Sequence, residues 1–214
     1  IDGEKTILHL KAREEKQIDY VLFDPGNRVL KRQTFERSVQ ELGAQLEKAS
    51  KMIDRYDAAV ALRDVDLDAK RDLLASVFAK ESSPYVRAEI VRQLAEDSES
   101  VDLLETALRD SSSTVRGAAL KHVTPISDPL VDEFERALID SSYHNVEIAL
   151  DRLTSAYPSQ TQEYLDRTAS TDGHDHNVRI KWLTIRADLE NKTVPDKLID
   201  YAGPSYSFRT RVPA

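Results

Sequence analysis

The chain has 214 residues, the size of one ordinary domain or of one domain with part of another. Its 40% hydrophobic and 32% charged residues suit a soluble protein with many exposed helix faces, and its formal net charge of −8 disfavours nucleic acid as a partner. The absence of cysteine excludes disulfide bonds, thiolate chemistry and cysteine-ligated zinc.

Turn-forming residues are few, because the sequence has only 6 glycines and 8 prolines. This scarcity favours helices over a fold with many strands. No apolar run approaches the roughly 18 residues of a membrane span, and no signal peptide is visible, so we expect no membrane partner. The composition is compatible with the cytoplasm and with the periplasm. Because the chain begins at Ile1 and not at methionine, we expect it to be part of a longer protein.

Residues 1–33 are predicted to be β structure. Thr6–Leu10 alternates loosely, Ile18–Phe23 is β-rich and apolar, and Arg28–Lys31 can return as a partner strand. A tight turn is predicted at Asp24–Asn27, which has proline at its second position and glycine at its third. Two or three strands are not stable alone. They are therefore either the terminal strands of a preceding β-sandwich domain, which we favour, or a small sheet packed on the helices.

From Thr34 onward the pattern is helical. Phe35, Val39, Leu42 and Leu46 follow the spacing of one apolar helix face. No strand-like stretch interrupts the pattern afterwards, so the fold class is predicted to be mostly α.

A short motif recurs in this helical part. In Ser83–Ala88 and Ser113–Ala118 a polar turn is followed by valine, arginine and a small residue, and further copies begin at His144, His176 and, more weakly, Ser205. The apolar positions of successive copies lie 29, 31, 32 and 30 residues apart. These positions are Val86, Val115, Val146, Val178 and Phe208.

Each copy is preceded by an amphipathic segment and a turn whose serines and aspartates can accept hydrogen bonds from the N–H groups that begin the next helix. Helix, polar turn and helix at a near-constant interval predict an α-solenoid. The residues resemble HEAT repeats over 34–214, although the period is shorter than the roughly 40–47 residues of typical units. We expect the last repeat, which begins near Ser205, to be truncated at Ala214.

Four copies carry an arginine directly after the apolar position, and Glu147 replaces it in the remaining copy. Such a row could bind anions, or each arginine could pair with an aspartate of its own or a neighbouring turn, such as Asp110. We favour the pairing, because repeats place the same charge pair at every junction. The arginines are Arg87, Arg116, Arg179 and Arg209.

Candidate metal sites are weak. Asp172–His176 holds two histidines and two aspartates, but it lies in a predicted loop and lacks a third fixed ligand from elsewhere. Asp64, Asp66 and Asp68 alternate in a loop without the glycine and distal glutamate of an EF-hand. We interpret both segments as solvated loops and assign no metal, cofactor or catalytic residue. The five histidines are His9, His122, His144, His174 and His176.

No sequence motif for catalysis is present: there is no H-E-x-x-H, no glycine-rich phosphate loop and no G-x-S-x-G. Trp182 and Tyr201 are expected to be core residues. We therefore do not expect this chain to be an enzyme by itself.

The stretch Tyr20–Lys31 resembles the strand-turn-strand with which the β-sandwich domain of aminopeptidase N family zinc metallopeptidases ends. The order of β segment, phenylalanine-led helix at Phe35 and helical repeats is also similar to that family. The resemblance implies a parent zinc aminopeptidase whose H-E-x-x-H and zinc-binding glutamate precede Ile1. It implies that this chain covers the catalytic domain, contacts the parent's own catalytic and β domains, and shapes the access of peptide substrates.

The alternative is a HEAT-repeat scaffold that binds a protein or peptide, because such repeats occur in many unrelated proteins. A self-contained enzyme is the least favoured interpretation. An H-E-x-x-H upstream of Ile1 would indicate the peptidase, whereas further repeats upstream would indicate the scaffold.

Overall fold

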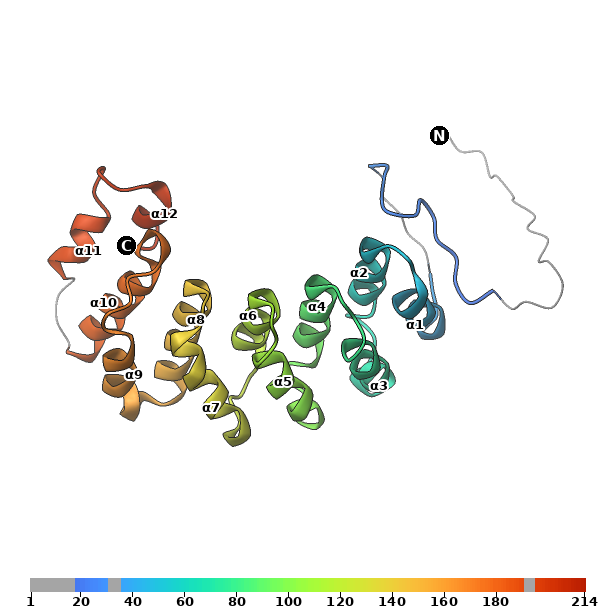
Figure 1. The fold of residues 1–214 in the computed structure, drawn as a ribbon, viewed down its shortest axis with the longest axis horizontal. Helices are drawn as coiled ribbons and strands as arrows, with labels where there is room; N and C mark the ends of the chain where they lie inside the picture. Colours follow the sequence, from blue (N-terminus) through green and yellow to red (C-terminus); the bar gives the residue numbers. More distant parts are fainter. Residues whose placement is uncertain (1–17, 31–35, 191–194) are drawn as a thin grey trace. The chain divides into compact units, whose positions relative to one another are not determined.

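The computed structural model describes residues 18–30, 36–190 and 195–214. Within these ranges the chain is mostly helical, with twelve α-helices and no β-strand (Figure 1), which confirms the mostly α prediction. The helices are α1 Val39–Lys48, α2 Met52–Ala61, α3 Leu67–Phe78, α4 Pro84–Leu94, α5 Val101–Leu108, α6 Ser113–His122, α7 Asp128–Arg136, α8 Tyr143–Ala156, α9 Thr161–Thr168, α10 Asn177–Leu189, α11 Asp196–Tyr201 and α12 Phe208–Arg211. Short 3₁₀ helices are η1 Ser98–Ser100, η2 Ala137–Ile139, η3 Pro158–Gln160 and η4 His174–His176.

The expected β segment forms a turn but no strand where it is described. Asn27 N–H donates to the carbonyl of Asp24 at 3.0 Å, and Gly26 has φ +86°, so the predicted tight turn is present. No strand is assigned to residues 18–30. An isolated hairpin is marginal in water, and nothing in the described ranges offers these residues a sheet. Lys31 and Thr6–Leu10 lie outside the described residues.

The chain divides into two compact units, Ile1–Lys70 and Arg71–Ala214. In the first unit α1 packs on α2. Ser38 caps α1 in a capping box with Glu41, in which Glu41 N–H donates to Ser38 Oγ and Ser38 N–H donates to Glu41 Oε2. Leu42 and Leu46, expected on one apolar face, are both buried.

In the second unit helices that are one sequence repeat apart are neighbours. α4 packs on α6, α6 on α8 and α8 on α10, while α5 and α9 contact the flanking members of this row (Figure 1). The four aligned valines are at most 1% exposed. The fifth aligned residue, Phe208, is 72% exposed in the four-residue helix α12, so the weakest copy does not pack like the others.

Asparagine side chains bridge successive helices of this row. Asn145 Nδ2 donates to the carbonyl of Ser113 at 3.1 Å, and Asn177 Nδ2 donates to the carbonyl of Tyr143 at 3.2 Å. A Cβ at Gly117 would lie 2.7 Å from Asn145 Oδ1. Glycine at this point of α6 therefore leaves room for the asparagine of α8.

Within the described ranges, the helices are all too short or too polar to cross a lipid bilayer.

Candidate functional site

The arginine row was the first candidate site, and the structure places two of its members in ion pairs. Arg87 donates from Nε and Nη2 to the two carboxylate oxygens of Asp110, each at 2.9 Å. Arg116 donates in the same way to Asp140 at 2.6 and 2.7 Å. The predicted pairing is confirmed here, and in both cases the carboxylate belongs to the turn of the following repeat. Each pair is bidentate and partly buried, which is the strong form of this interaction.

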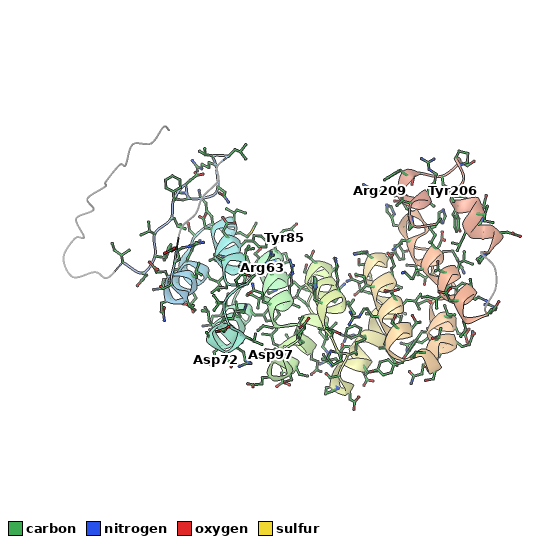
Figure 2. All side chains as sticks on the ribbon, turned by 180° about the vertical axis from the view of Figure 1, so that it is seen from behind. Arg63, Asp72, Tyr85, Asp97, Tyr206 and Arg209 are labelled. Carbon is green, nitrogen blue, oxygen red and sulfur yellow. The ribbon has the colours of Figure 1, made fainter. Side chains whose placement is uncertain are left out.

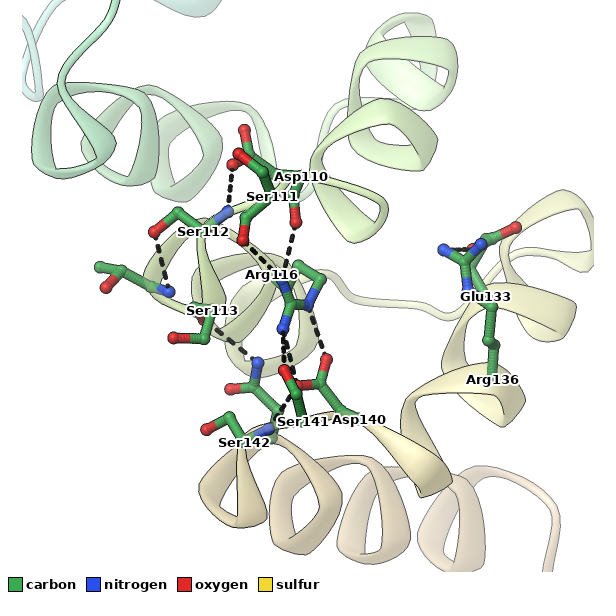
Figure 3. A network of polar contacts seen from close by, with 12 residues as sticks. Asp110, Ser111, Ser112, Ser113, Arg116, Glu133, Arg136, Asp140, Ser141 and Ser142 are labelled. Atoms are coloured by element: carbon green, nitrogen blue, oxygen red, sulfur yellow. Dashed lines mark hydrogen bonds and ion pairs between the residues drawn. The ribbon is translucent and has the colours of Figure 1, made fainter.

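Each of these arginines also closes the turn that precedes its own helix. Arg116 Nη1 donates to the carbonyls of Asp110 and Ser111 at 2.7 and 3.2 Å (Figure 3). The same turn is stabilised from the other side, because Ser112 N–H donates to Asp110 Oδ1 at 2.8 Å. With a further bond from Nη2 to Ser141 Oγ at 3.2 Å, Arg116 uses all five of its N–H donors within the protein, and Arg87 uses four of its five.

Burial opposes ionisation of Asp140, but hydrogen bonds from Arg116 and Ser142, the Arg116 charge and a hydrogen bond from Asn145 together lower its pKa. Asp140 therefore carries its charge at neutral pH as part of the junction.

The other two arginines of the row differ. Arg179 donates to the carbonyl of Ala169 at 2.7 Å and lies over the ring of Trp182, with its guanidinium carbon 5.2 Å from the ring centroid. Arg209 is exposed on α12 near Tyr206 (Figure 2). The four arginines thus do not form one anion-binding surface.

The histidine-rich loop Asp172–His176 has an unusual backbone. Gly173, Asp175 and His176 all have positive φ, at +86°, +51° and +63°. His176 Nδ1 lies 2.7 Å from Asp172 Oδ2, and its ring stacks on Tyr201 with centroids 4.6 Å apart. His176 is thus engaged with an aromatic side chain and one carboxylate rather than with a set of ligands.

Across the described ranges, no group of three histidine, aspartate or glutamate side chains is placed to hold a metal ion. His174 is exposed, and Asp64, Asp66 and Asp68 are exposed at the turn before and at the start of α3.

The remaining histidines lie apart from these segments. Burial, followed by the positive charges of nearby basic side chains, lowers the pKa of His122. His144 lies 3.6 Å from Glu147, and His9 lies outside the described residues.

Trp182 and Tyr201 are core residues, as expected from the sequence. Trp182 is 8% exposed, and its Nε1–H donates to the carbonyl of Leu165 at 2.7 Å. Tyr201 packs with Ile180 and Leu198 in a small cluster, and burial raises its pKa.

The contact between the Asp24–Asn27 turn and α2 was not anticipated from the sequence. Gly26 N–H donates to Asp54 Oδ1 at 2.7 Å, and Asn27 Nδ2 donates to Asp57 Oδ2 at 2.8 Å. Lys51 Nζ donates to the carbonyl of Pro25 at 2.9 Å. We call this set of three contacts the turn clamp. The three contacts join residues that lie 26 to 30 positions apart, so a local sequence pattern could not predict them.

A pocket of about 330 Å³ lies beside the turn clamp in the same unit, between residues 21–27 and helices α1 and α2. Its lining combines the apolar side chains of Val21, Leu22 and Phe23 with Arg37 and Gln45. Three carboxylates, those of Asp24, Asp54 and Asp57, also line the pocket, and each accepts a hydrogen bond from within residues 24–29.

Comparisons with models of protein families, with curated proteins and with solved structures give no match to this chain. The described residues provide a row of packed helices, bidentate arginine–aspartate pairs at two of its junctions, and a turn hydrogen-bonded to α2.

Proposed function

We propose that the second unit is a HEAT-like α-solenoid and that the chain is the non-catalytic C-terminal part of a zinc aminopeptidase. The solenoid part is supported by α4, α6, α8 and α10, which lie one repeat apart in sequence and pack as neighbours. It is further supported by the repeated arginine–aspartate geometry, in which Arg87 and Arg116 make equivalent contacts.

The turn clamp is the single observation that carries the aminopeptidase proposal. The resemblance to that family rests on Tyr20–Lys31, and the turn at its centre is held on α2 by Asp54, Asp57 and Lys51. A turn that is fixed to the first helices is what a rigid junction between a preceding β domain and the helical domain requires. In a peptidase this clamp joins the β-sandwich domain rigidly to the helical domain.

The exposed apolar side chains beside the turn fit the same arrangement. Phe23, Val29 and Leu30 are 69%, 62% and 102% exposed. In the proposed parent they pack on the preceding β domain, which also provides the strands that residues 18–23 and 28–31 need to form a sheet.

This position assigns different roles to the catalytic domain and to this chain in the proposed parent. Zinc and the general base belong to the catalytic domain upstream, and no residue of this chain is assigned to them. The helical domain covers that catalytic domain, contacts the β domain and limits which peptides reach the zinc.

The test starts from the complete coding sequence that contains this chain. We expect H-E-x-x-H and a more distant glutamate upstream of Ile1, about one equivalent of zinc in the purified full-length protein, and hydrolysis of aminoacyl-p-nitroanilides. A full-length protein that lacks these features and does not hydrolyse the substrates would refute the aminopeptidase proposal.

The regular junctions favour a second candidate, a HEAT-repeat scaffold that binds a protein or peptide. Scaffolds of this kind depend on the same packing from repeat to repeat that α4, α6 and α8 show. Further helical repeats upstream of Ile1, in place of a β domain, would favour this candidate.

A further inference from the structure

Three basic side chains occupy the same position in three successive repeats. Each lies six residues after the buried valine that opens its helix, on α4, α6 and α8. Because α4 packs on α6 and α6 packs on α8, equal positions on these helices lie in a row across the surface. We call Arg92, Lys121 and Arg152 the basic row.

Contacts between the helices support this adjacency. The Arg152 guanidinium on α8 donates to the carbonyl of Val123 and, at 3.5 Å, to that of Lys121, so it lies at the C-terminal end of α6. His122, the next residue on α6, experiences the positive charges of all three members, which act together with burial to lower its pKa.

The members of the basic row lack carboxylate partners. Of the residues that the structure describes, none forms an ion pair with Arg92, Lys121 or Arg152, whereas Arg87 and Arg116 pair with Asp110 and Asp140. Arg92 and Lys121 are exposed, and Arg152 is partly exposed. Glu89, an acidic residue whose charge also acts on His122, is 5% exposed and accepts a hydrogen bond from Gln93.

A cluster of unneutralised positive charge is an exception in a chain of net charge −8. Exposed cations without partners keep their full hydration and are available to an incoming anion. Successive packed helices lie about 8–10 Å apart, so the row spans about 16–20 Å. An extended polypeptide covers this distance with about five or six residues, at ~3.3 Å per residue.

We propose that the basic row binds an extended acidic polypeptide segment that carries a carboxylate at every second or third residue. Nucleic acid fits less well, because three cations neutralise few phosphates and the remaining protein surface repels a phosphate backbone. This inference goes beyond the proposed function and does not depend on it, because the binding is a property of this chain alone.

The test measures fluorescence anisotropy of a fluorescein-labelled peptide of alternating glutamate and serine with the complete chain. We expect binding at about 20 mM NaCl that weakens at least tenfold at about 300 mM. The same peptide with glutamine in place of glutamate is expected not to bind.

The double variant Arg92→Gln/Lys121→Gln is expected to weaken binding by about three- to tenfold, since an exposed ion pair contributes only modestly to affinity. Arg152 is left unchanged because it also holds the end of α6. The matched control Lys80→Gln/Arg211→Gln removes two exposed cations outside the row and is expected to change binding less than twofold.

Three results would overturn the proposal. The first is no binding of the glutamate peptide at low salt, and the second is an equal loss in the two double variants. The third is tighter binding of a single-stranded oligonucleotide of equal charge, which would make the row a nucleic-acid surface. Circular dichroism of each variant confirms that the fold is retained.

Discussion

A single side chain, Arg116, connects three consecutive parts of the chain. It donates to the carbonyl of Asp110 in the turn before its helix and to the carboxylate of Asp140 in the turn of the next repeat. Asp140 is 5% exposed as a side chain and also accepts the Ser142 N–H. Removing Arg116 leaves the buried Asp140 carboxylate without its countercharge, which costs more than the net value of the pair.

We therefore expect Arg116→Gln to lower the free energy of unfolding by about 2–4 kcal/mol. Urea unfolding followed by far-ultraviolet circular dichroism measures this loss. The control is Arg136→Gln, because Arg136 is half exposed and its buried partner Glu133 keeps a second ion pair, with Arg109. Its expected cost is about 0–1 kcal/mol. Equal losses in the two variants would contradict a special role for the junction.

Asp97 provides a pH-dependent contribution to stability. Its hydrogen bond from Arg71 lowers its pKa against the opposing effect of burial, with further help from Ser100 and the Glu99 N–H. A carboxyl whose pKa is lower in the folded than in the unfolded protein stabilises the fold above the unfolded value. This contribution disappears as the pH falls through the folded value.

We expect Asp97→Asn to be less stable than the wild type at pH 7, and the difference to shrink as the pH falls below about 4. Urea midpoints of both proteins measured from pH 7 to pH 3 test this. A difference that stays constant over the range would show that the stabilisation by Asp97 does not depend on its charge.

At the scale of elements, the periodic spacing of apolar residues predicted which positions of the repeated helices are buried. The aligned positions Val86, Val115, Val146 and Val178 are buried because each begins a helix of at least ten residues that packs on its neighbours. Phe208 carries a similar local pattern, but its helix has four residues and cannot bury it. The sequence motif alone therefore does not establish a packed repeat.

Contacts between distant residues could not be predicted in this way. His176 stacks on Tyr201, which is 25 residues further along the chain, and Gly26 binds Asp54. The basic row was missed for another reason: the aligned motif ended before the sixth residue after each valine. Extending the comparison of repeats by one helical turn would have revealed Arg92, Lys121 and Arg152.

The turn clamp can be tested at the same scale. Asp54→Ala removes the acceptor of the Gly26 N–H, and we expect faster tryptic cleavage after Arg28 with little change in helix content. Mass spectrometry of the cleavage products over time measures the rate. Asp66→Ala removes an exposed carboxylate before α3 and should leave the cleavage rate unchanged. Cleavage at the wild-type rate in Asp54→Ala would argue against the clamp.

At the scale of the whole molecule, the proposed stack of repeats predicts that each helix depends on its neighbours. In the second unit α8 packs on α6 before it and on α10 after it. A defect in α8 should therefore weaken both neighbours more than the more distant α4.

Leu150 is fully buried in α8, and we expect Leu150→Ala to destabilise the unit by about 2–5 kcal/mol. Hydrogen exchange read by mass spectrometry should show lost protection in α6, α8 and α10, and less in α4. Phe208→Ala at an exposed position should change stability by about 0.5 kcal/mol or less. Uniform loss of protection over α4–α10 would instead indicate one cooperative block.

The equivalence of two junctions has a consequence for how this chain can vary in length. Arg87 binds the carbonyls of Glu81 and Ser82, and Arg116 binds those of Asp110 and Ser111. Excision of the 29 residues from Pro84 to Ser112 would join Ser83 to Ser113 and place Arg116 where Arg87 had been. Its two carbonyl acceptors and its aspartate would all remain. At this junction one repeat can thus stand in for the next, whereas contacts made by the excised residues themselves, such as that of Asp97 with Arg71, would be lost.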